Sequence, residues 1–378
     1  MKIVLFCHSF VSCWNHGNVH FLRGIARELI RLGHAVAVYE AKDGWSRTEL
    51  VREQGFAALA QGARVVPGVE LVTYRPASLD LDRALDGADI VLVHEWTEPD
   101  LVRRIGRVRA RSGRFVLLFH DTHHRAVSAP DDIAACDLED YDGVLAFGEV
   151  LRQIYLALGW GRRAFTWHEA ADTALFRPRA AEKDVDLVWI GNWGDGERDR
   201  ELQHFLIEPV SRLGIGACVH GVRYPQSLRD RLAGHGIVHA GWVPNHRVPA
   251  AFARARVTVH IPRRPYATAL PGIPTIRMFE ALACGIPLVS APWSDTEGLF
   301  PPGSYLAAAH ADAMTDGVAR LLRDRAFAAE QARRGLQAIR ARHGCAHRVI
   351  ELLRIVAALR RPPAPQPPTV QPLQDMAI

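Results

Sequence analysis

The feature of this sequence that most constrains its fold is a repeated alternation of short apolar runs with longer segments of helical periodicity. The run at residues 2–7 is followed by a segment at 19–32 in which apolar side chains recur every three or four positions. Gly33 ends that segment, and a second apolar run follows at 35–39. Two strands joined through a helix pair in parallel, so this order predicts a parallel sheet.

The same order recurs along most of the chain. Further strands are predicted at 71–74, 89–94, 114–120, 143–147 and 164–167, with helices at 98–111 and 148–158. After a polar stretch at 177–184, a second series predicts strands at 185–190, 215–220, 236–240, 257–261 and 288–290, with helices at 199–213, 225–233, 246–254, 312–323 and 326–342. The alternation indicates an α/β protein of two Rossmann-like, doubly wound domains that face a cleft.

The chain length of 378 residues also favours two domains. We expect an N-terminal domain at 1–170 and a C-terminal domain at 180–345. A last amphipathic helix at 346–360 is expected to pack back on the N-terminal domain. Residues 361–378 contain six prolines and show no apolar periodicity, which is typical of a disordered tail.

The composition excludes several classes of function. The net charge of +5 comes from 46 basic and 41 acidic residues that are mixed along the chain, which does not indicate a nucleic-acid surface. Six cysteines lie scattered without a CxxC pair, so we expect reduced thiols and a cytoplasmic protein. The N-terminal apolar run is too short for a secretory segment, and no run is long enough for a transmembrane helix.

The stretch from Gly272 to Ser290 is predicted to be a helix followed directly by a buried strand. Pro274 suits the first turn of the helix, and Gly285 suits its end. Arg277 and Glu280 lie one turn apart near the positive N-terminus of the helix, where they would adjoin a phosphate and a ribose. The alternative is a solvated ion pair on a surface helix.

A glycine-rich loop in the second series is a second candidate for phosphate binding. Gly191 and Asn192 follow a predicted strand, three glycines precede Arg198, and a helix follows. Glycines let the backbone approach a pyrophosphate, and Arg198 can neutralise it. Trp242 lies in a strand-to-helix turn and is a candidate platform for the base, unless it is an ordinary buried tryptophan.

Histidines stand at the ends of three predicted strands of the first domain, in Cys7-His8, His94-Glu95 and His120-Asp121. The carboxyl ends of neighbouring parallel strands converge on one crevice, so we expect these side chains to meet at the cleft floor. His120 and Asp121 are the strongest candidates for proton transfer. The run from His120 to His124 also resembles part of a metal site, but one segment lacks the ligands to close a coordination sphere, so no bound metal is expected.

With these motifs in place, residues 168–296 resemble the nucleotide-sugar domain of a glycosyltransferase of the two-Rossmann GT-B architecture, and the likeness extends to about residue 360. It is closest to the spore-protein (CgeB-like) branch and is also similar to the group 1 transferases. In the interdomain segment Glu169-Ala-Ala-Asp-Thr-Ala-Leu-Phe-Arg-Pro178, Asp172, Phe176 and Pro178 match the family pattern.

The resemblance implies roles for individual residues. It places Arg198 at the basic residue of the phosphate loop, Glu280 at the ribose-binding glutamate and Arg277 at an arginine of the spore-protein branch. Gly272 stands where the broad group carries a further glutamate near the transferred sugar. His120-Asp121 matches a pair that faces the acceptor, and His16-Gly17 resembles the loop that opens the first domain.

We therefore predict a hexosyltransferase-like enzyme that moves a sugar from a UDP-, GDP- or dTDP-linked donor to an acceptor without a metal or other cofactor. Alternatives are a nucleotide-sugar epimerase of the same architecture, a non-catalytic assembly protein that retains the fold, and a metal-dependent hydrolase. The predicted catalytic residues are His120 and Asp121, and the predicted donor-binding residues are Gly191, Asn192, Arg198, Trp242, Arg277 and Glu280. The predicted acceptor-side residues are His16, Gly17, His94, Glu95 and Glu169.

Overall fold

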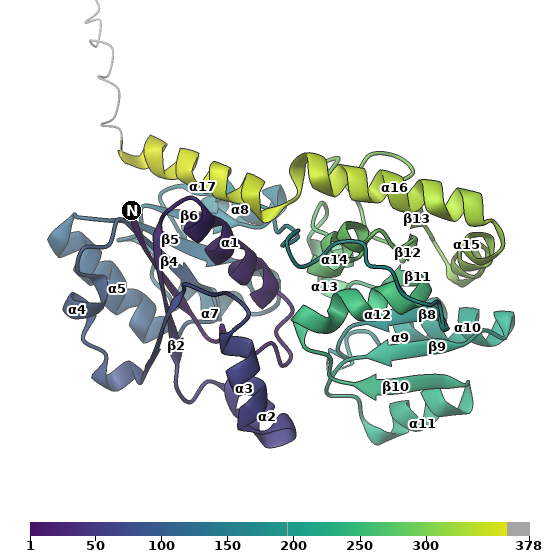
Figure 1. Cartoon of the computed structure of the whole chain (residues 1–378). Helices are drawn as coiled ribbons and strands as arrows, with labels where there is room; N and C mark the ends of the chain where they lie inside the picture. The colour runs from purple at the N-terminus through teal and green to yellow at the C-terminus, as the bar shows by residue number, and fades with distance from the viewer. Residues whose placement is uncertain (195, 361–378) are drawn as a thin grey trace, which may run out of the picture.

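The computed structural model describes residues 1–194 and 196–360 and forms two α/β domains side by side (Figure 1). The tail at 361–378, for which we predict disorder, lies outside the described residues. No helix among those described is long and apolar enough to cross a membrane.

The first domain is built on a parallel sheet in the order β3-β2-β1-β4-β5-β6-β7. Its strands are β1 (Lys2–Cys7), β2 (Ala35–Ala41), β3 (Glu70–Tyr74), β4 (Ile90–His94), β5 (Val116–Asp121), β6 (Gly143–Ala146) and β7 (Ala164–Thr166). Its helices are α1 (Val19–Arg31), α2 (Trp45–Gln54), α3 (Phe56–Ala63), α4 (Leu81–Leu85), α5 (Pro99–Ser112), α6 (Arg125–Ser128), α7 (Pro130–Ala134) and α8 (Glu149–Ala157), with a 3₁₀ turn η1 (Pro76–Ser78).

The second domain is built on a parallel sheet in the order β10-β9-β8-β11-β12-β13. Its strands are β8 (Val185–Ile190), β9 (Ala217–His220), β10 (Ile237–Gly241), β11 (Ala255–His260), β12 (Leu288–Ser290) and β13 (Leu306–Ala307). Its helices are α9 (Asp199–Leu202), α10 (Glu208–Leu213), α11 (Gln226–Gly234), α12 (Val248–Arg254), α13 (Arg264–Ala269), α14 (Ile276–Cys284), α15 (Ala311–Arg323) and α16 (Arg325–Arg342), with a π segment η2 (Gln203–Ile207) and a 3₁₀ turn η3 (Asn245–Arg247).

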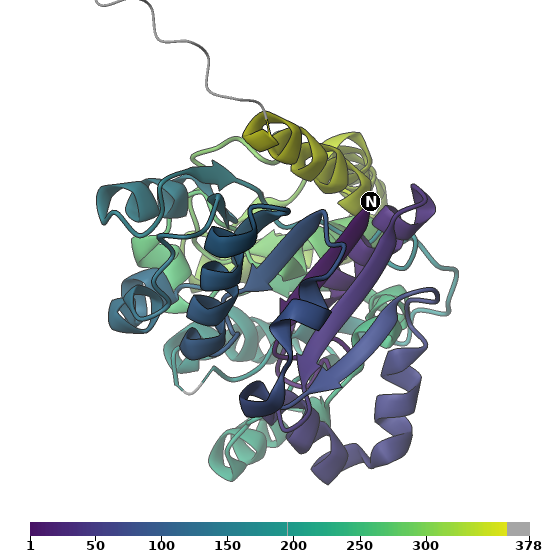
Figure 2. The ribbon, with the colours of Figure 1, turned by 90° about the vertical axis from the view of Figure 1, so that its left-hand side faces the viewer.

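In each sheet the first strand of the domain, β1 or β8, lies in the interior, and later strands are added on both sides of it. This is the doubly wound arrangement expected from the sequence. Apolar side chains of β1 and β4 are almost completely buried, because helices cover both faces of a parallel sheet. Figure 2 shows the first sheet with its helices on both sides. The predicted fold class is therefore confirmed.

Several elements differ from the sequence-based expectation. The segment at 199–213 is not one uniform helix, since the π segment η2 separates α9 from α10. The helix α14 begins at Ile276 after Thr275, so Pro274 precedes the helix and does not lie in its first turn. The pair α2 and α3 has no counterpart in the prediction.

The last helix, α17 (Cys345–Arg360), lies on the first domain, although the rest of the C-terminal half builds the second domain (Figure 1). It packs along α1, and Gly24 of α1 makes the close approach possible, because a Cβ there would lie 2.4 Å from Sγ of Cys345. Just before α17, Ala171 N donates to His343 O and Cys345 N donates to Ala171 O, each at 2.9 Å. The outgoing and returning segments between the domains are therefore hydrogen-bonded to one another.

Candidate functional site

A cavity of about 340 Å³ lies between the domains at the carboxyl ends of both sheets. Binding sites in open parallel sheets lie at these ends, so the cavity is the candidate functional site. The first domain lines it with His8, Asn15, His16, Gly17, Asn18, Trp45, Trp96, Thr122, His123, Phe147 and Glu169, and the second domain with Gly191, Asn192, Arg198, Arg223, Arg263, Tyr266, Thr275, Ile276 and Arg277.

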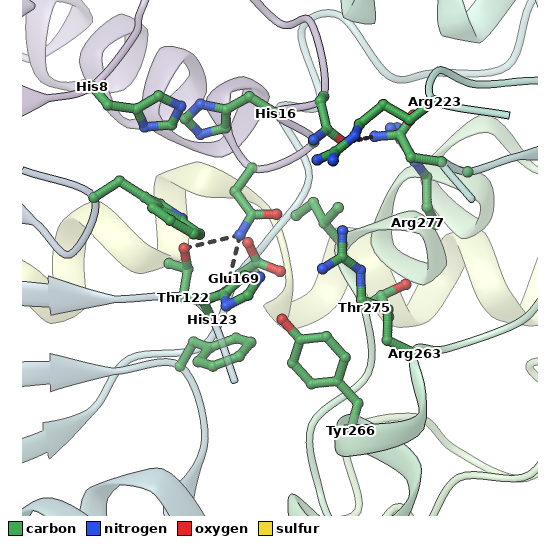
Figure 3. Close-up of a pocket in the computed structure, with 18 of the residues that line it drawn as sticks. His8, His16, Thr122, His123, Glu169, Arg223, Arg263, Tyr266, Thr275 and Arg277 are labelled. Carbon is green, nitrogen blue, oxygen red and sulfur yellow. Dashed lines mark hydrogen bonds between the residues drawn. The ribbon is translucent and has the colours of Figure 1, made fainter. Parts of the chain in front are cut away.

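The charges around the cavity are strongly asymmetric. Four arginines line it from the second domain, and Glu169 is the single carboxylate among the described lining residues. In Figure 3, Arg223, Arg263 and Arg277 lie opposite the histidines of the first domain. Clustered cations in a partly enclosed site favour an anion, and guanidinium groups suit phosphate oxygens.

Arg198 is held at the cavity by the loop that follows β8. Its Nη1 donates to the carbonyl oxygen of Asn192 at 2.7 Å, and its guanidinium carbon lies 5.8 Å from the centre of the Trp189 ring. The side chain is 8% exposed, and burial together with the nearby Arg263 lowers the pKa of Arg198 to about 9. Without an anion, this guanidinium is therefore held in an unfavourable environment.

The glycine-rich loop also contacts the first domain. Asn192 Nδ2 donates to Asn15 Oδ1 at 2.5 Å, and Asn192 Oδ1 accepts from the Val222 N–H at 3.0 Å. Gly191 has no room for a side chain, because a Cβ there would lie 2.5 Å from the Trp189 ring. Asn15 has φ of 48° and Arg223 has φ of 65°, so two cavity residues are held in the left-handed region that is uncommon for residues other than glycine.

Arg277 and Glu280 occupy different positions relative to the cavity. Arg277 lines the cavity, whereas the Glu280 side chain is completely buried behind it and is not a lining residue. Oε1 of Glu280 lies 2.7 Å from Nδ1 of His20, and Oε2 accepts a hydrogen bond from Arg277. Burial raises the pKa of Glu280, but Arg277 and His20 outweigh it and the net pKa is lowered. Glu280 is thus an ionised anchor for Arg277.

Gly272 lies in the left-handed region with φ of 91°, and a Cβ there would lie 2.7 Å from Oγ1 of Thr296 and 2.9 Å from Oε1 of Glu297. A glutamate at this position would clash, which explains the departure noted in the sequence. Glu297 instead bridges the domains, since it accepts from the Glu149 N–H at 2.9 Å and lies 2.8 Å from Nε2 of His168.

His120 and Asp121 lie below the cavity and not among the residues that line it. The His120 ring packs against Trp167, with ring centres 4.9 Å apart, and burial lowers the pKa of His120 to about 3. Asp121 accepts from the Tyr155 hydroxyl at 2.8 Å and from the His123 N–H at 2.9 Å, and burial raises its pKa to about 6. The cavity is lined instead by His123.

Two other predicted acceptor-side residues also lie under the cavity surface. The Glu95 side chain is fully buried, accepts from Arg125 at 3.1 Å and lies 3.4 Å from the Thr122 hydroxyl. His94 Nε2 lies 3.2 Å from the same hydroxyl. Both residues therefore support Thr122, which does line the cavity.

Trp242 lies outside the lining of the cavity. It packs on a small apolar cluster formed by Val11, Trp14, Leu50, Leu59 and Val222. This cluster joins the loop after β1 and the pair α2–α3 to the second domain, so the structure gives Trp242 an interdomain packing position.

Of the remaining predicted residues, the structure places His16, Gly17, Glu169, Gly191, Asn192, Arg198 and Arg277 around the cavity. Sequence analysis missed several lining residues, namely Arg223, Arg263, Tyr266, His123, Trp45 and Trp96. Arg223 and Arg263 each follow a strand end of the second sheet by only a few residues, and that position is the signal that could have identified them. Within residues 1–194 and 196–360, no group of three or more His, Cys, Asp or Glu side chains is arranged to hold a metal ion.

Comparisons with known proteins agree with this geometry. Residues 198–354 match the family described as glycosyl transferase-like. The fold is similar to sucrose-phosphate synthase from Thermosynechococcus elongatus, with a TM-score of 0.65 and 15% identity over 95% of this chain and 99% of that chain. It is also similar to Anabaena Alr3699/HepE in complex with UDP-glucose, with a TM-score of 0.67 and 14% identity over 95% and 100% of the two chains. No curated protein sequence matches.

A third similar structure is the T4 phage BGT in complex with its UDP-glucose substrate, with a TM-score of 0.59 and 10% identity over 94% of this chain and 99% of that chain. The family match and the shared two-domain fold confirm an enzyme of the glycosyltransferase class with the GT-B architecture.

Proposed function

We propose that this glycosyltransferase transfers a sugar from a nucleoside diphosphate sugar to a hydroxyl group of an acceptor bound against the first domain, without a metal. The observation that carries the proposal is the group of four arginines that line the interdomain cavity. Among the described lining residues, Glu169 is the one carboxylate. The similar structures that contain UDP or UDP-glucose favour uracil as the base of the donor. We also propose that the chain belongs to the spore-protein (CgeB-like) branch of these enzymes.

The diphosphate would bind between Arg198, Arg277 and the N-terminus of α14. These groups supply positive charge that offsets the charge of the leaving diphosphate, and the dipole of the helix adds to it. Glu280 and His20 would not contact the diphosphate. Glu280 accepts a hydrogen bond from Arg277 and is itself held by His20, so the two residues fix the position of Arg277.

In the reaction, the acceptor oxygen forms a bond to the anomeric carbon while the bond from that carbon to the β-phosphate oxygen breaks. The electron pair leaves with the diphosphate, and the acceptor hydroxyl must lose its proton. Glu169 is placed to take the proton, because it lines the cavity and its Oε1 has no hydrogen-bond partner among the described atoms. Burial and the nearby Glu280 raise the pKa of Glu169, which increases its basicity.

His120 and Asp121 take a positioning role in this proposal. Asp121 accepts from the His123 N–H and so fixes the start of the loop that carries His123 into the cavity. The His120 ring packs against Phe21 and Trp167, which fixes the end of β5 before that loop.

The test compares the natural chain with Glu169→Gln. We expect the natural chain to bind UDP in calorimetry and to release UDP from a UDP-sugar when an acceptor is present. Glu169→Gln should lower kcat by 100-fold or more, in the range of general-base catalysis, and leave the Kd for UDP within twofold. Full activity of the variant would remove Glu169 from the mechanism.

Acceptor dependence separates transfer from the epimerase alternative. An epimerase would convert the donor sugar without releasing UDP, and that outcome would contradict transfer.

A further inference from the structure

The first-domain wall of the cavity has a chemical character different from the arginine-rich wall. Six of its lining residues carry aromatic or imidazole rings, and all but Phe147 are linked to one another by ring contacts, namely His8, His16, Trp45, Trp96 and His123. The charged groups of the cavity lie elsewhere, apart from Glu169 near the domain boundary. This wall is the side on which the proposed transfer reaction needs an acceptor.

Three of the rings form one continuous stack. The His8 ring lies parallel to His16, with ring centres 4.1 Å apart, and parallel to Trp45, with ring centres 5.1 Å apart. Trp96 stands nearly edge-on to His8 at 6.1 Å and to His123 at 5.1 Å. Figure 3 shows the His8 and His16 rings side by side on this wall. The rings therefore present flat apolar faces together with polar ring edges.

The polar edges lack partners inside the protein. His8 and His16 are each 6% exposed, and neither ring nitrogen of either residue has a hydrogen-bond partner among the residues that the structure describes. Nδ1 of His123 is also unsatisfied within the same part of the chain. Buried polar atoms are normally satisfied, so these nitrogens point to a ligand that supplies the missing hydrogen bonds.

The charge state of the imidazoles defines what such a ligand must offer. Burial lowers the pKa of His8 to about 3 and holds the pKa values of His16 and His123 well below the usual range, so all three rings are neutral at pH 7. A neutral imidazole has one N–H donor and one acceptor nitrogen. A hydroxyl group also donates one hydrogen bond and accepts others, which makes it the matching partner.

The wall is held in place by contacts that do not involve a ligand. Oε2 of Glu40 accepts from the N–H groups of Phe10 and Val11, at 2.6 and 2.9 Å, and so fixes the loop after β1. Gly44 allows α2 to begin against that loop, because a Cβ there would lie 2.8 Å from the His8 carbonyl oxygen. Trp45, the first residue of α2, remains 40% exposed at the cavity rim. A large apolar ring left exposed at a prebuilt site is available for stacking.

We propose, resting on the transferase function above, that the stack of Trp45, His8 and His16 together with Trp96 is an acceptor site for a neutral saccharide. The C–H bonds of a pyranose ring would pack on the tryptophan faces, and its hydroxyls would pair with the imidazole nitrogens. An acidic sugar would find no cation among the described lining residues of this wall, because Arg125, whose guanidinium carbon lies 4.2 Å from the centre of the Trp96 ring, pairs with Glu95 and does not line the cavity. A long alkyl alcohol would leave the imidazole nitrogens unsatisfied.

The first experiment measures binding by saturation-transfer NMR on the full chain, with and without UDP. The probes are a neutral methyl pyranoside, a neutral disaccharide, glucuronate and a long-chain alcohol. We expect saturation transfer to the neutral saccharides and at least tenfold weaker binding of glucuronate and the alcohol. Preference for glucuronate or the alcohol would overturn the proposal. The disaccharide distinguishes the end of a larger glycan from a free sugar.

The second experiment uses variants. Trp45→Ala and His16→Phe should each raise the apparent Kd or KM for the neutral saccharide at least tenfold, because one removes the flat face and the other removes only the ring nitrogens. Trp45→Phe should recover part of the loss. Trp160→Phe is the control and should change nothing, because Trp160 packs against Tyr155 and is not among the lining residues of the cavity. Unchanged saccharide affinity in both Trp45→Ala and His16→Phe would refute the site.

Affinity for UDP separates this proposal from the function on which it rests. We expect the Kd for UDP to stay within twofold in all these variants. If the natural chain does not bind UDP but still binds neutral saccharides at these residues, the donor assignment fails and the saccharide site stands. If UDP binds and neutral saccharides do not, the saccharide site fails and the donor assignment stands.

Discussion

Replacing Arg198 by methionine should stabilise the unliganded protein and weaken its binding of a diphosphate. Burial lowers the pKa of Arg198 from the ordinary value of an arginine to about 9, which corresponds to roughly 4 to 5 kcal/mol that disfavours the charged side chain in the folded state. Methionine fills a similar volume without charge, but it loses the hydrogen bond to the Asn192 carbonyl oxygen, which costs about 1 to 3 kcal/mol. The difference predicts a gain of about 1 to 4 kcal/mol in the free energy of unfolding without ligand.

The same substitution acts in the opposite direction on affinity. A hydrogen bond from a guanidinium to a phosphate contributes about 1.5 to 3 kcal/mol, which corresponds to roughly 10- to 150-fold in Kd. Urea denaturation without ligand and calorimetry with UDP measure the two effects on one preparation. Arg200→Met, an exposed arginine of α9 outside the cavity, is the control and should change neither quantity.

The reasoning is refuted if Arg198→Met destabilises the free protein and binds UDP as tightly as the natural chain. That pair of results would mean that Arg198 is a structural residue and that its environment is favourable without an anion.

Two further predictions concern stability. Gly24→Ala should lower the free energy of unfolding by about 1 to 3 kcal/mol, because its Cβ would overlap Sγ of Cys345, and adding Cys345→Ala should recover part of the loss in the same urea titration. Asp121 has a raised pKa of about 6 in the folded state, so its contribution to stability is present below about pH 4 and is lost as the pH rises through 6. The stability difference between Asp121→Asn and the natural chain should therefore grow by about 2 kcal/mol in favour of the variant between pH 4 and pH 7, and a constant difference would contradict the assigned environment.

Much of the fold was predictable because the strands are almost completely apolar and are separated by periodic helical segments. Parallel strands that are covered on both faces require this pattern, and β1, β4 and β5 have it. The pair α2–α3 was not predictable in the same way, since the sequence of α2 has no continuous apolar stripe. Its packing depends on the loop after β1 and on Val222 of the other domain.

At the site, the position of a residue relative to the end of its strand decides whether its side chain lines the cavity. His94 and His120 are still inside β4 and β5, where they pair in register, so their side chains lie within the layers that helices cover. His8, Thr122 and His123 lie one or two residues beyond a strand and line the cavity. Sequence reasoning placed the ends of β1 and β4 correctly and the end of β5 one residue early. It did not distinguish a histidine that is the last residue or the last but one of a strand from a histidine that follows the strand, and successive side chains of a strand point in opposite directions.

The arginines illustrate a different limit. Arg277 and Arg198 could be found because each lies beside a local motif, a helix start or a glycine-rich loop. Arg223 and Arg263 lie in loops without such a motif, and their one signal in the sequence is a position two or three residues after a predicted strand, which β9 and β11 bring to the same edge of the sheet.

The two segments that connect the domains have a mechanical consequence. Because Ala171 is hydrogen-bonded to both His343 and Cys345, the two connecting segments are tied together, and we expect any relative rotation of the two domains to pivot near them. Glu169 is only two residues from Ala171 and would be displaced little, whereas side chains further from this pivot would move more. Such a pivot would let sugar and nucleotide enter and leave at the rim while the proposed base remains fixed in its place.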